Sequence, residues 1–163
     1  FDRMVEAKDY QALKACGEKM KEILNDLDKL NAFHPYCSLD KWIEDARKMG
    51  DSPQLKDYYE KNARNLITTW GGSLNDYASR SWAGLISDYY SKRWEVYINT
   101  FINAVGEGVT VDQKQLENKL KEIEESWVNA TERKNTRKDV HLTTGGLLSF
   151  SAFLFSKYQR LVK

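Results

Sequence analysis

The residues of this chain that could do chemistry by type and spacing are first of all acidic. Glycoside hydrolysis usually needs two carboxylates across a sugar bond, and the 163-residue chain has 24 Asp and Glu side chains. One close group is Asp40, Glu44 and Asp45, and another lies within residues 122–125. Both groups stand among lysines on expected helices, which is typical of solvated salt bridges. The sequence therefore assigns no catalytic residue.

The sequence also has no motif typical of a metal site or a cofactor site. His34 and His141 fall in expected loops or at helix edges, without a second ligand at metal-binding spacing. Cys16 and Cys37 match no zinc or redox motif. No serine has the surroundings of a nucleophile elbow, and the glycines form no phosphate-binding loop. We expect no metal and no cofactor.

The aromatic segment at residues 64–94 gives a different signal. Trp70 stands at the end of an expected helix, directly before Gly71 and Gly72, rather than on a repeating core face. A Trp or Tyr ring can lie against the C–H face of a pyranose while its N–H or O–H reaches a sugar hydroxyl. Trp70 and Tyr77 suit this role. Packing in the core fits the spacing of Trp70 equally well and that of Tyr77 better.

The rest of this segment favours packing. Trp82, Leu85, Ile86 and Tyr89 recur on one helix face, which predicts a core face. Gly84 within this helix indicates a close contact with another helix. The three arginines of the segment lie among acids and tyrosines, which favours buried or half-buried ion pairs over anion binding; they are Arg64, Arg80 and Arg93.

The elements that must position these side chains are helices. Only two prolines occur, strong helix formers fill most windows, and no alternating stretch predicts a strand. We expect an all-α fold, a compact bundle of about six helices, in a single domain over residues 1–163. The net charge of +1 comes from interspersed signs, so we expect no nucleic acid partner and no membrane partner. No apolar run reaches the length of a membrane span.

Capping residues predict where the helices begin and end. Ser38 is an expected N-cap, Pro53 an expected first helical residue after Ser52, and a bend is expected near Ser91. Thr110 or Asp112 caps a later helix. The expected helices are 4–30, a short one after residue 38, 53–69, 77–105, a helix ending near residue 128, and 147–161.

Several motifs occur together and in order across residues 41–101. They are KWIEDAR at 41–47, YYEKNAR at 58–64, WG at 70–71, LNDYA at 74–78, WAGLISDYY at 82–90 and RW at 93–94. This set closely resembles the C-terminal helical domain of the α-N-acetylglucosaminidases of glycoside hydrolase family 89. Lys92 departs from the pattern, because many relatives have proline there, and residues 72–73 form a short version of a variable loop. The tail at 141–163 does not align, and its role stays open.

The resemblance implies a retaining exo-enzyme that removes terminal α-linked N-acetylglucosamine (GlcNAc) from a glycan. It places two catalytic glutamates on a TIM barrel that precedes this domain, so this chain holds no counterpart of them and should not hydrolyse substrate alone. The domain would pack beside that barrel and supply a wall of the GlcNAc pocket. Matched residue by residue, that wall includes Trp70, Leu74 and Tyr77. The family setting is secreted, periplasmic or lysosomal.

Two alternatives stand beside the accessory domain of a glycosidase. The chain could be a free-standing helical interaction module, or a free-standing sugar-binding module. We favour the accessory domain, and because the sequence begins with Phe1 we expect a piece of a longer protein.

Overall fold

A computed structural model describes residues 1–70, 79–131 and 144–161 of the chain, and within these ranges it is helical. The α-helices are α1 (Asp2–Glu6), α2 (Tyr10–Asn31), α3 (Leu39–Lys48), α4 (Pro53–Leu66), α5 (Ser91–Glu107), α6 (Gln113–Asn129) and α7 (Thr144–Tyr158). A π-helical turn, η1 (Ile86–Tyr90), runs directly into α5, and a 3₁₀ turn, η2 (Gln159–Leu161), follows α7. The all-α class is confirmed.

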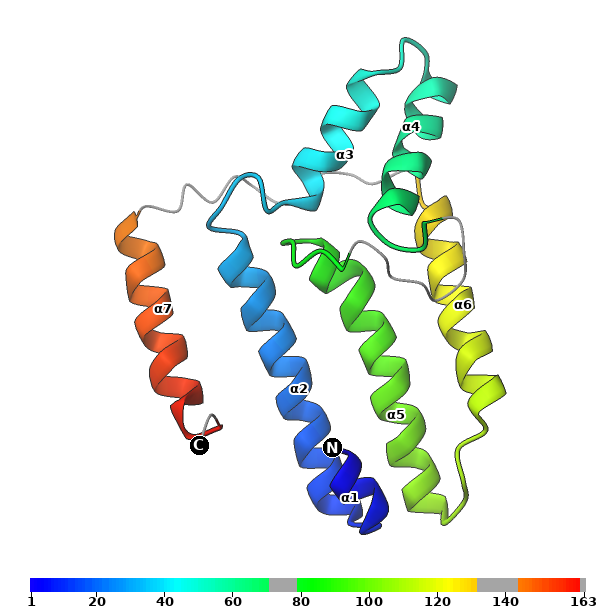
Figure 1. Cartoon of the computed structure of the whole chain (residues 1–163), viewed down its shortest axis with the longest axis vertical. Helices are drawn as coiled ribbons and strands as arrows, with labels where there is room; N and C mark the ends of the chain where they lie inside the picture. The colour runs from blue at the N-terminus through cyan, green and yellow to red at the C-terminus, as the bar shows by residue number, and fades with distance from the viewer. Residues whose placement is uncertain (71–78, 132–143, 162–163) are drawn as a thin grey trace.

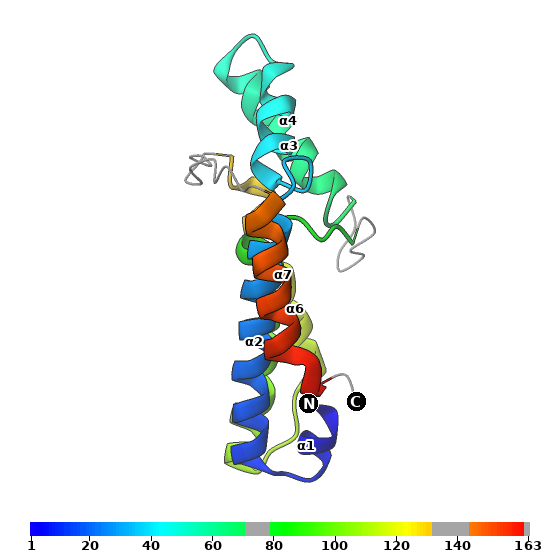
Figure 2. The same ribbon diagram turned by 90° about the vertical axis from the view of Figure 1, so that its left-hand side faces the viewer.

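The long helices lie side by side in one layer, in the order α7, α2, α5 and α6 (Figure 1). Viewed along the layer, α7, α2 and α6 overlap, which shows how thin the layer is (Figure 2). The α3–α4 hairpin stands at one end, and α1 with the N-terminus lies at the other. Among the described residues no helix is long and apolar enough to span a membrane.

The prediction of one unbroken helix over residues 4–30 is wrong at its start. The helix ends at Glu6, Lys8 takes a left-handed φ of 53°, and α2 begins at Tyr10. The side chain of Asp9 accepts a hydrogen bond from Ala12 N (3.0 Å) and so caps α2. An N-cap that satisfies a free backbone N–H competes with helix continuation, and here the cap prevails.

The predicted start of α4 is confirmed. Ser52 accepts from Leu55 N (3.3 Å), and Pro53 occupies the first turn. The hairpin turn before it needs a glycine, because a Cβ on Gly50 would lie 2.6 Å from Lys56 N. The predicted end at residue 69 is wrong, since α4 ends at Leu66 and a turn follows.

The start of the fifth helix also differs from the prediction. Residues 79–82 are not helical, and the helical run begins around Leu85 with the π-helical turn that ends just before Ser91. Asp28 of α2 accepts from Gly84 N (2.7 Å) and Ser87 N (3.1 Å), and Gly84 has φ 88°. A carboxylate that satisfies free N–H groups fixes a helix start. The close contact expected at Gly84 is therefore this hydrogen bond to α2.

The other boundaries follow the sequence more closely. Gly108 ends α5 with φ 69°, as glycine does at helix C-termini. Asp112, not Thr110, caps α6 by accepting from Lys114 N and Gln115 N. The last helix begins at Thr144, three residues before the predicted start.

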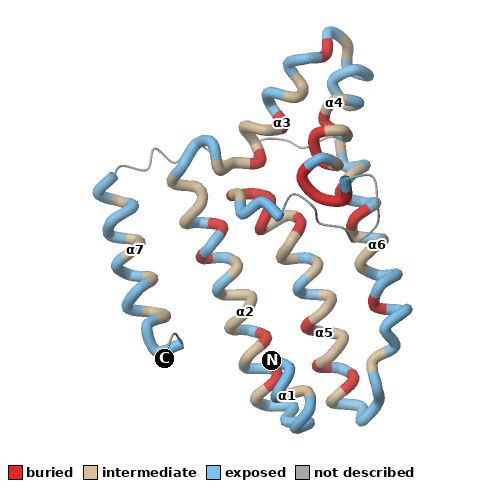
Figure 3. The backbone as a smooth tube through the Cα atoms, in the orientation of Figure 1, coloured by how far each residue is buried: buried red, intermediate tan, exposed pale blue. Residues whose placement is uncertain are grey.

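Two separate hydrophobic clusters hold the helices together (Figure 3). The hairpin cluster joins α3, α4, η1 and α6, and its buried members are Leu39, Ile43, Ala63, Ile67, Leu85, Tyr89 and Trp127. The layer cluster joins α2 and α5 through Leu13, Ile98 and Ile102, with α1 residues packed against it. The predicted core face is confirmed at Leu85, Ile86 and Tyr89, which are buried, and Trp82 packs partly buried against the hairpin cluster.

Candidate functional site

Trp70 follows α4 and faces solvent. Its side chain is 52% exposed, and its backbone has a φ of 51°. The backbone N–H of Trp70 donates to the backbone carbonyl oxygen of Asn65 (2.8 Å). A left-handed backbone costs a non-glycine residue about 1–2 kcal/mol, and such strained residues concentrate at functional sites. The turn itself is fixed by Thr68, whose hydroxyl donates to Arg64 O (2.8 Å).

A cleft of about 480 Å³ lies beside Trp70 at the base of the hairpin. We call it the aromatic cleft. Its described lining residues are Tyr36, Ser38, Lys41, Trp42, Asp45, Leu66, Ile67, Trp70, Arg80 and Trp82. An apolar, aromatic wall with a few polar groups is the composition of small-ligand sites.

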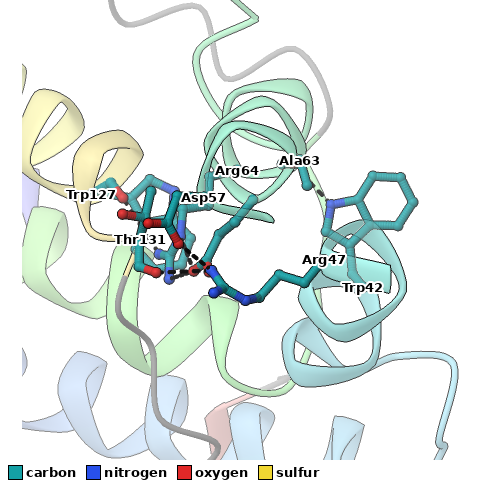
Figure 4. Close-up of polar contacts among 8 residues, drawn as sticks. Trp42, Arg47, Asp57, Ala63, Arg64, Trp127 and Thr131 are labelled. Carbon is teal, nitrogen blue, oxygen red and sulfur yellow. Dashed lines mark hydrogen bonds and ion pairs between the residues drawn. The ribbon is translucent and has the colours of Figure 1, made fainter. Parts of the chain in front are cut away.

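Three pairings fix the aromatic cleft. Trp42 and Trp82 lie with ring centroids 5.7 Å apart, and Trp42 Nε1 donates to Ala63 O (2.9 Å; Figure 4). The strand-like contact of residues 37–39 with Ala83 places Trp82 here, because Leu39 N donates to Ala83 O and Ala83 N to Cys37 O. The cleft therefore has a rigid floor of partly buried indole rings.

Arg80 differs from the other two arginines of its segment. It is exposed, and its guanidinium carbon lies 5.4 Å from the Trp82 ring centroid. The expectation of an ion pair is met at Arg64, which binds Glu60, and at Arg93, which lies 3.6 Å from Glu124. Arg80 instead lines the aromatic cleft.

Leu74 and Tyr77 lie within residues 71–78, outside the described residues. Among the described residues that line the aromatic cleft, Trp70 and Arg80 are the nearest in sequence before and after this segment. Sequence reasoning singled out Trp70 but not Tyr36, Trp42 or Arg80 as cleft residues. For Trp42, nothing but the family motif at 41–47 drew attention to it.

A buried ionic network lies on the other side of α4. Glu60 is fully buried and Arg64 is 2% exposed. Glu60 Oε1 accepts from Arg64 Nε (2.9 Å) and Nη2 (2.6 Å), and Glu60 Oε2 accepts from Arg47 Nη1 (2.6 Å). Arg47 also donates to Asp57 Oδ1 (2.8 Å) and to Thr131 O (3.0 Å; Figure 4). The network ties α3 and α4 to the end of α6.

The charges of this network are engaged in structure rather than free for chemistry. The hydrogen bond with Asp57 raises the pKa of the Arg47 guanidinium. Arg64 is stacked 4.3 Å above the Trp127 ring and donates to Trp127 O (3.4 Å). Both carboxylate oxygens of Glu60 accept hydrogen bonds from arginines, so the carboxylate is engaged within the network.

A second, larger cleft of about 860 Å³ opens between α4, α5 and α6, next to this network. Lys92 and Lys119 line it together with Asp88 and Glu122, so it favours neither anions nor cations. Nothing in its lining distinguishes a ligand class.

Three of the acidic side chains in the two groups named from the sequence lie in salt bridges: Glu44, Asp45 and Glu124. Asp45 pairs with Lys41 and Lys48, and Glu44 with Lys48 (2.5 Å). The hydrogen bond from Lys41 lowers the pKa of Asp45. Glu124 is an exception to the solvated interpretation, because it is buried beside Arg93. In the described ranges no three His, Cys, Asp or Glu side chains gather as metal ligands.

Comparison with known proteins agrees with this architecture. Residues 1–157 match the family described as the alpha-N-acetylglucosaminidase (NAGLU) C-terminal domain. The match therefore includes most of the tail at 141–163, which the sequence motifs alone did not align. Alpha-N-acetylglucosaminidase from Homo sapiens is 32% identical over 123 residues, which are 74% of this chain and 17% of the human protein.

Solved structures of a Clostridium perfringens family 89 glycoside hydrolase share the fold. A doubly substituted form in complex with its substrate GlcNAc-alpha-1,4-galactose is 28% identical, with a TM-score of 0.75 over 94% of this chain and 18% of that one. The complex with PUGNAc is 27% identical, with a TM-score of 0.76 over 96% of this chain and 18% of that one. This chain thus spans less than a fifth of the length of these relatives.

An all-helical fold with an aromatic cleft, matching one part of much longer glycosidases, defines the class: the helical domains found in glycoside hydrolases. Within that class, the chain belongs to the α-N-acetylglucosaminidase C-terminal domain family of glycoside hydrolase family 89.

Proposed function

We propose that this chain is the C-terminal accessory domain of a retaining exo-α-N-acetylglucosaminidase. It packs beside a catalytic barrel of the same polypeptide and contributes one wall of the pocket for the terminal GlcNAc of a glycan. Trp70, Leu74 and Tyr77 form that wall. The catalytic glutamates belong to the barrel, so this chain alone does not hydrolyse an aryl α-N-acetylglucosaminide.

The observation that carries this proposal is the exposure and backbone conformation of Trp70. A large apolar ring is kept half exposed, on a left-handed backbone, at the edge of an aromatic cleft. Folding alone favours glycine at such a position. A bound pyranose would cover the exposed ring through its C–H face and so supply a reason to keep Trp there.

The test is Trp70→Ala in the full-length enzyme. Loss of a large apolar contact of about 1.5–3 kcal/mol in the transition state lowers kcat/KM about 10- to 150-fold. The melting temperature should change by less than about 3 °C, because an exposed side chain contributes little to stability. Trp94→Ala is the matched control, since Trp94 is also exposed but lies outside the aromatic cleft.

Trp70→Gly separates function from packing. Glycine relieves the left-handed strain, so this variant should unfold at an equal or higher temperature while losing the same activity as Trp70→Ala. If kcat/KM is unchanged in both variants, or if the melting temperature falls strongly, the role of Trp70 is packing and not sugar binding.

A further inference from the structure

Helix α7 is mostly apolar, and its only polar residues before Lys157 are one threonine and three serines. From Thr144 to Ser156 it carries no charged residue, and Lys157 is the first. A helix that is hydrophobic all round is normally buried in a protein core. Here no residue of α7 is buried, and Leu148 and Phe155 are 66% and 72% exposed. The described residues of this chain therefore leave α7 more exposed than is usual for such an apolar helix.

One side of α7 is already used. The Phe150 ring stacks on Phe33 near the end of α2, with centroids 5.7 Å apart. At the other end Lys157 Nζ and Tyr158 Oη both donate to Asp26 Oδ2, at 2.6 and 2.7 Å. These contacts at both ends fix which side faces α2.

The exposed side forms a continuous apolar stripe. Leu148, Ala152 and Phe155 are all exposed and stand at positions i, i+4 and i+7, which share one helix face. We call this the outer stripe. Helix α7 is also the edge helix of the layer, with α2 on its inner side (Figures 1 and 2). In the described part of the chain no element covers the outer stripe.

We propose that the outer stripe of α7 is the docking surface for the part of the enzyme polypeptide that precedes this domain. The chain spans 17–19% of the relatives it matches, and its family is a C-terminal domain, so most of such a polypeptide lies before it. The inference rests on the proposed function only in placing the chain within a longer enzyme. Its surface is separate from the aromatic cleft.

A second copy of this chain is the less suitable occupant. A stable dimer needs roughly 800 Å² on each partner, more than a single stripe of three side chains presents. A covalently attached partner needs less, because linkage replaces association by a high effective concentration. The occupant should offer an uncharged apolar face, since a charge buried against the stripe would go unpaired.

The test is hydroxyl-radical footprinting of the unmodified full-length enzyme, read by mass spectrometry. Phe155 and Leu148 should be oxidised about tenfold more slowly than in the unfolded enzyme, as expected of buried side chains. Met49 is the internal reference, because it is 72% exposed at the hairpin turn and should show little protection.

Two further measurements separate the outcomes. Equal oxidation of Phe155 and Met49, each relative to the unfolded enzyme, would overturn the proposal. Dilution is the second measurement. If light scattering shows an oligomer that dissociates on dilution, and the protection of Phe155 is lost with it, the outer stripe binds a second copy and the proposal is also overturned. In the full-length enzyme, Phe155→Arg should lower the melting temperature, whereas Met49→Arg should not. Footprinting needs no activity, so it stays independent of the result at Trp70.

Discussion

Glu60→Gln tests whether the buried network holds the hairpin to α6. The substitution keeps the shape of the side chain but removes the charge that faces Arg64 and Arg47. One amide position then presents N–H donors to arginine donors, and two guanidinium groups lose their shared anion. Glu60 and Arg64 are both buried, so water cannot replace the lost partner.

Breaking a buried ion pair on one side costs about 3–5 kcal/mol. Because the Arg47 side chain is 32% exposed and also has Asp57, we expect the lower end, about 3 kcal/mol. For a chain of this size that lowers the melting temperature by about 6–12 °C. The assay is urea and thermal unfolding of the 163-residue chain followed by far-ultraviolet circular dichroism.

Two controls make the result interpretable. Glu125→Gln makes the same change at an exposed position of α6 and should alter the free energy of unfolding by less than about 0.5 kcal/mol. The double change Glu60→Met with Arg64→Met should cost less than Glu60→Met alone, because it leaves no unpaired buried arginine at position 64. A loss below about 1 kcal/mol for Glu60→Gln, or a double variant less stable than the single one, would refute the reasoning.

Three further outcomes follow from the fold. Asp28→Ala removes the acceptor for Gly84 N and should cost about 1–2 kcal/mol in urea unfolding. Gly50→Ala places a Cβ against backbone and should cost at least about 1 kcal/mol in the same assay. At Asp26, burial raises the pKa, but hydrogen bonds from Lys157 and the following tyrosine outweigh it and lower the pKa below 3.8. The stabilisation it gives to α7 is therefore present above pH 3.8 and lost as the pH falls through the lowered value. Nuclear magnetic resonance signals of the α7 ring side chains should stay constant from neutral pH to about pH 5 and change in stronger acid.

Helix type and much of the core could be predicted because they depend on local pattern. The face that includes Leu85 and Tyr89 repeats at helical spacing, and Pro53 and Gly108 mark helix ends by their backbone chemistry. The start near Gly84 could not be predicted in this way, because its carboxylate cap comes from Asp28 on a distant helix. The break at Lys8 does have a local signal, the N-cap Asp9, which the helical spacing of the apolar residues on both sides outweighed in the prediction.

The candidate site was predictable to a similar extent. Trp70 was singled out because it ends an element, and its exposure agrees with that interpretation. Arg80 was expected in an ion pair because acids are near it in sequence, but its position over Trp82 is set by the contact of Ala83 with residues 37–39. Pairings between segments far apart in the chain have no local signature. The network of Glu60 and Arg47 depends on such pairing as well.

The separation of the two hydrophobic clusters has a consequence for how the domain opens. One continuous helical run, η1 with α5, passes through both: Tyr89 belongs to the hairpin cluster, and Ile98 and Ile102 to the layer cluster. Each cluster can lose its packing while the other persists, so amide exchange should fall into two cooperative groups. The run from η1 into α5 shares in both groups, and its amides should exchange last.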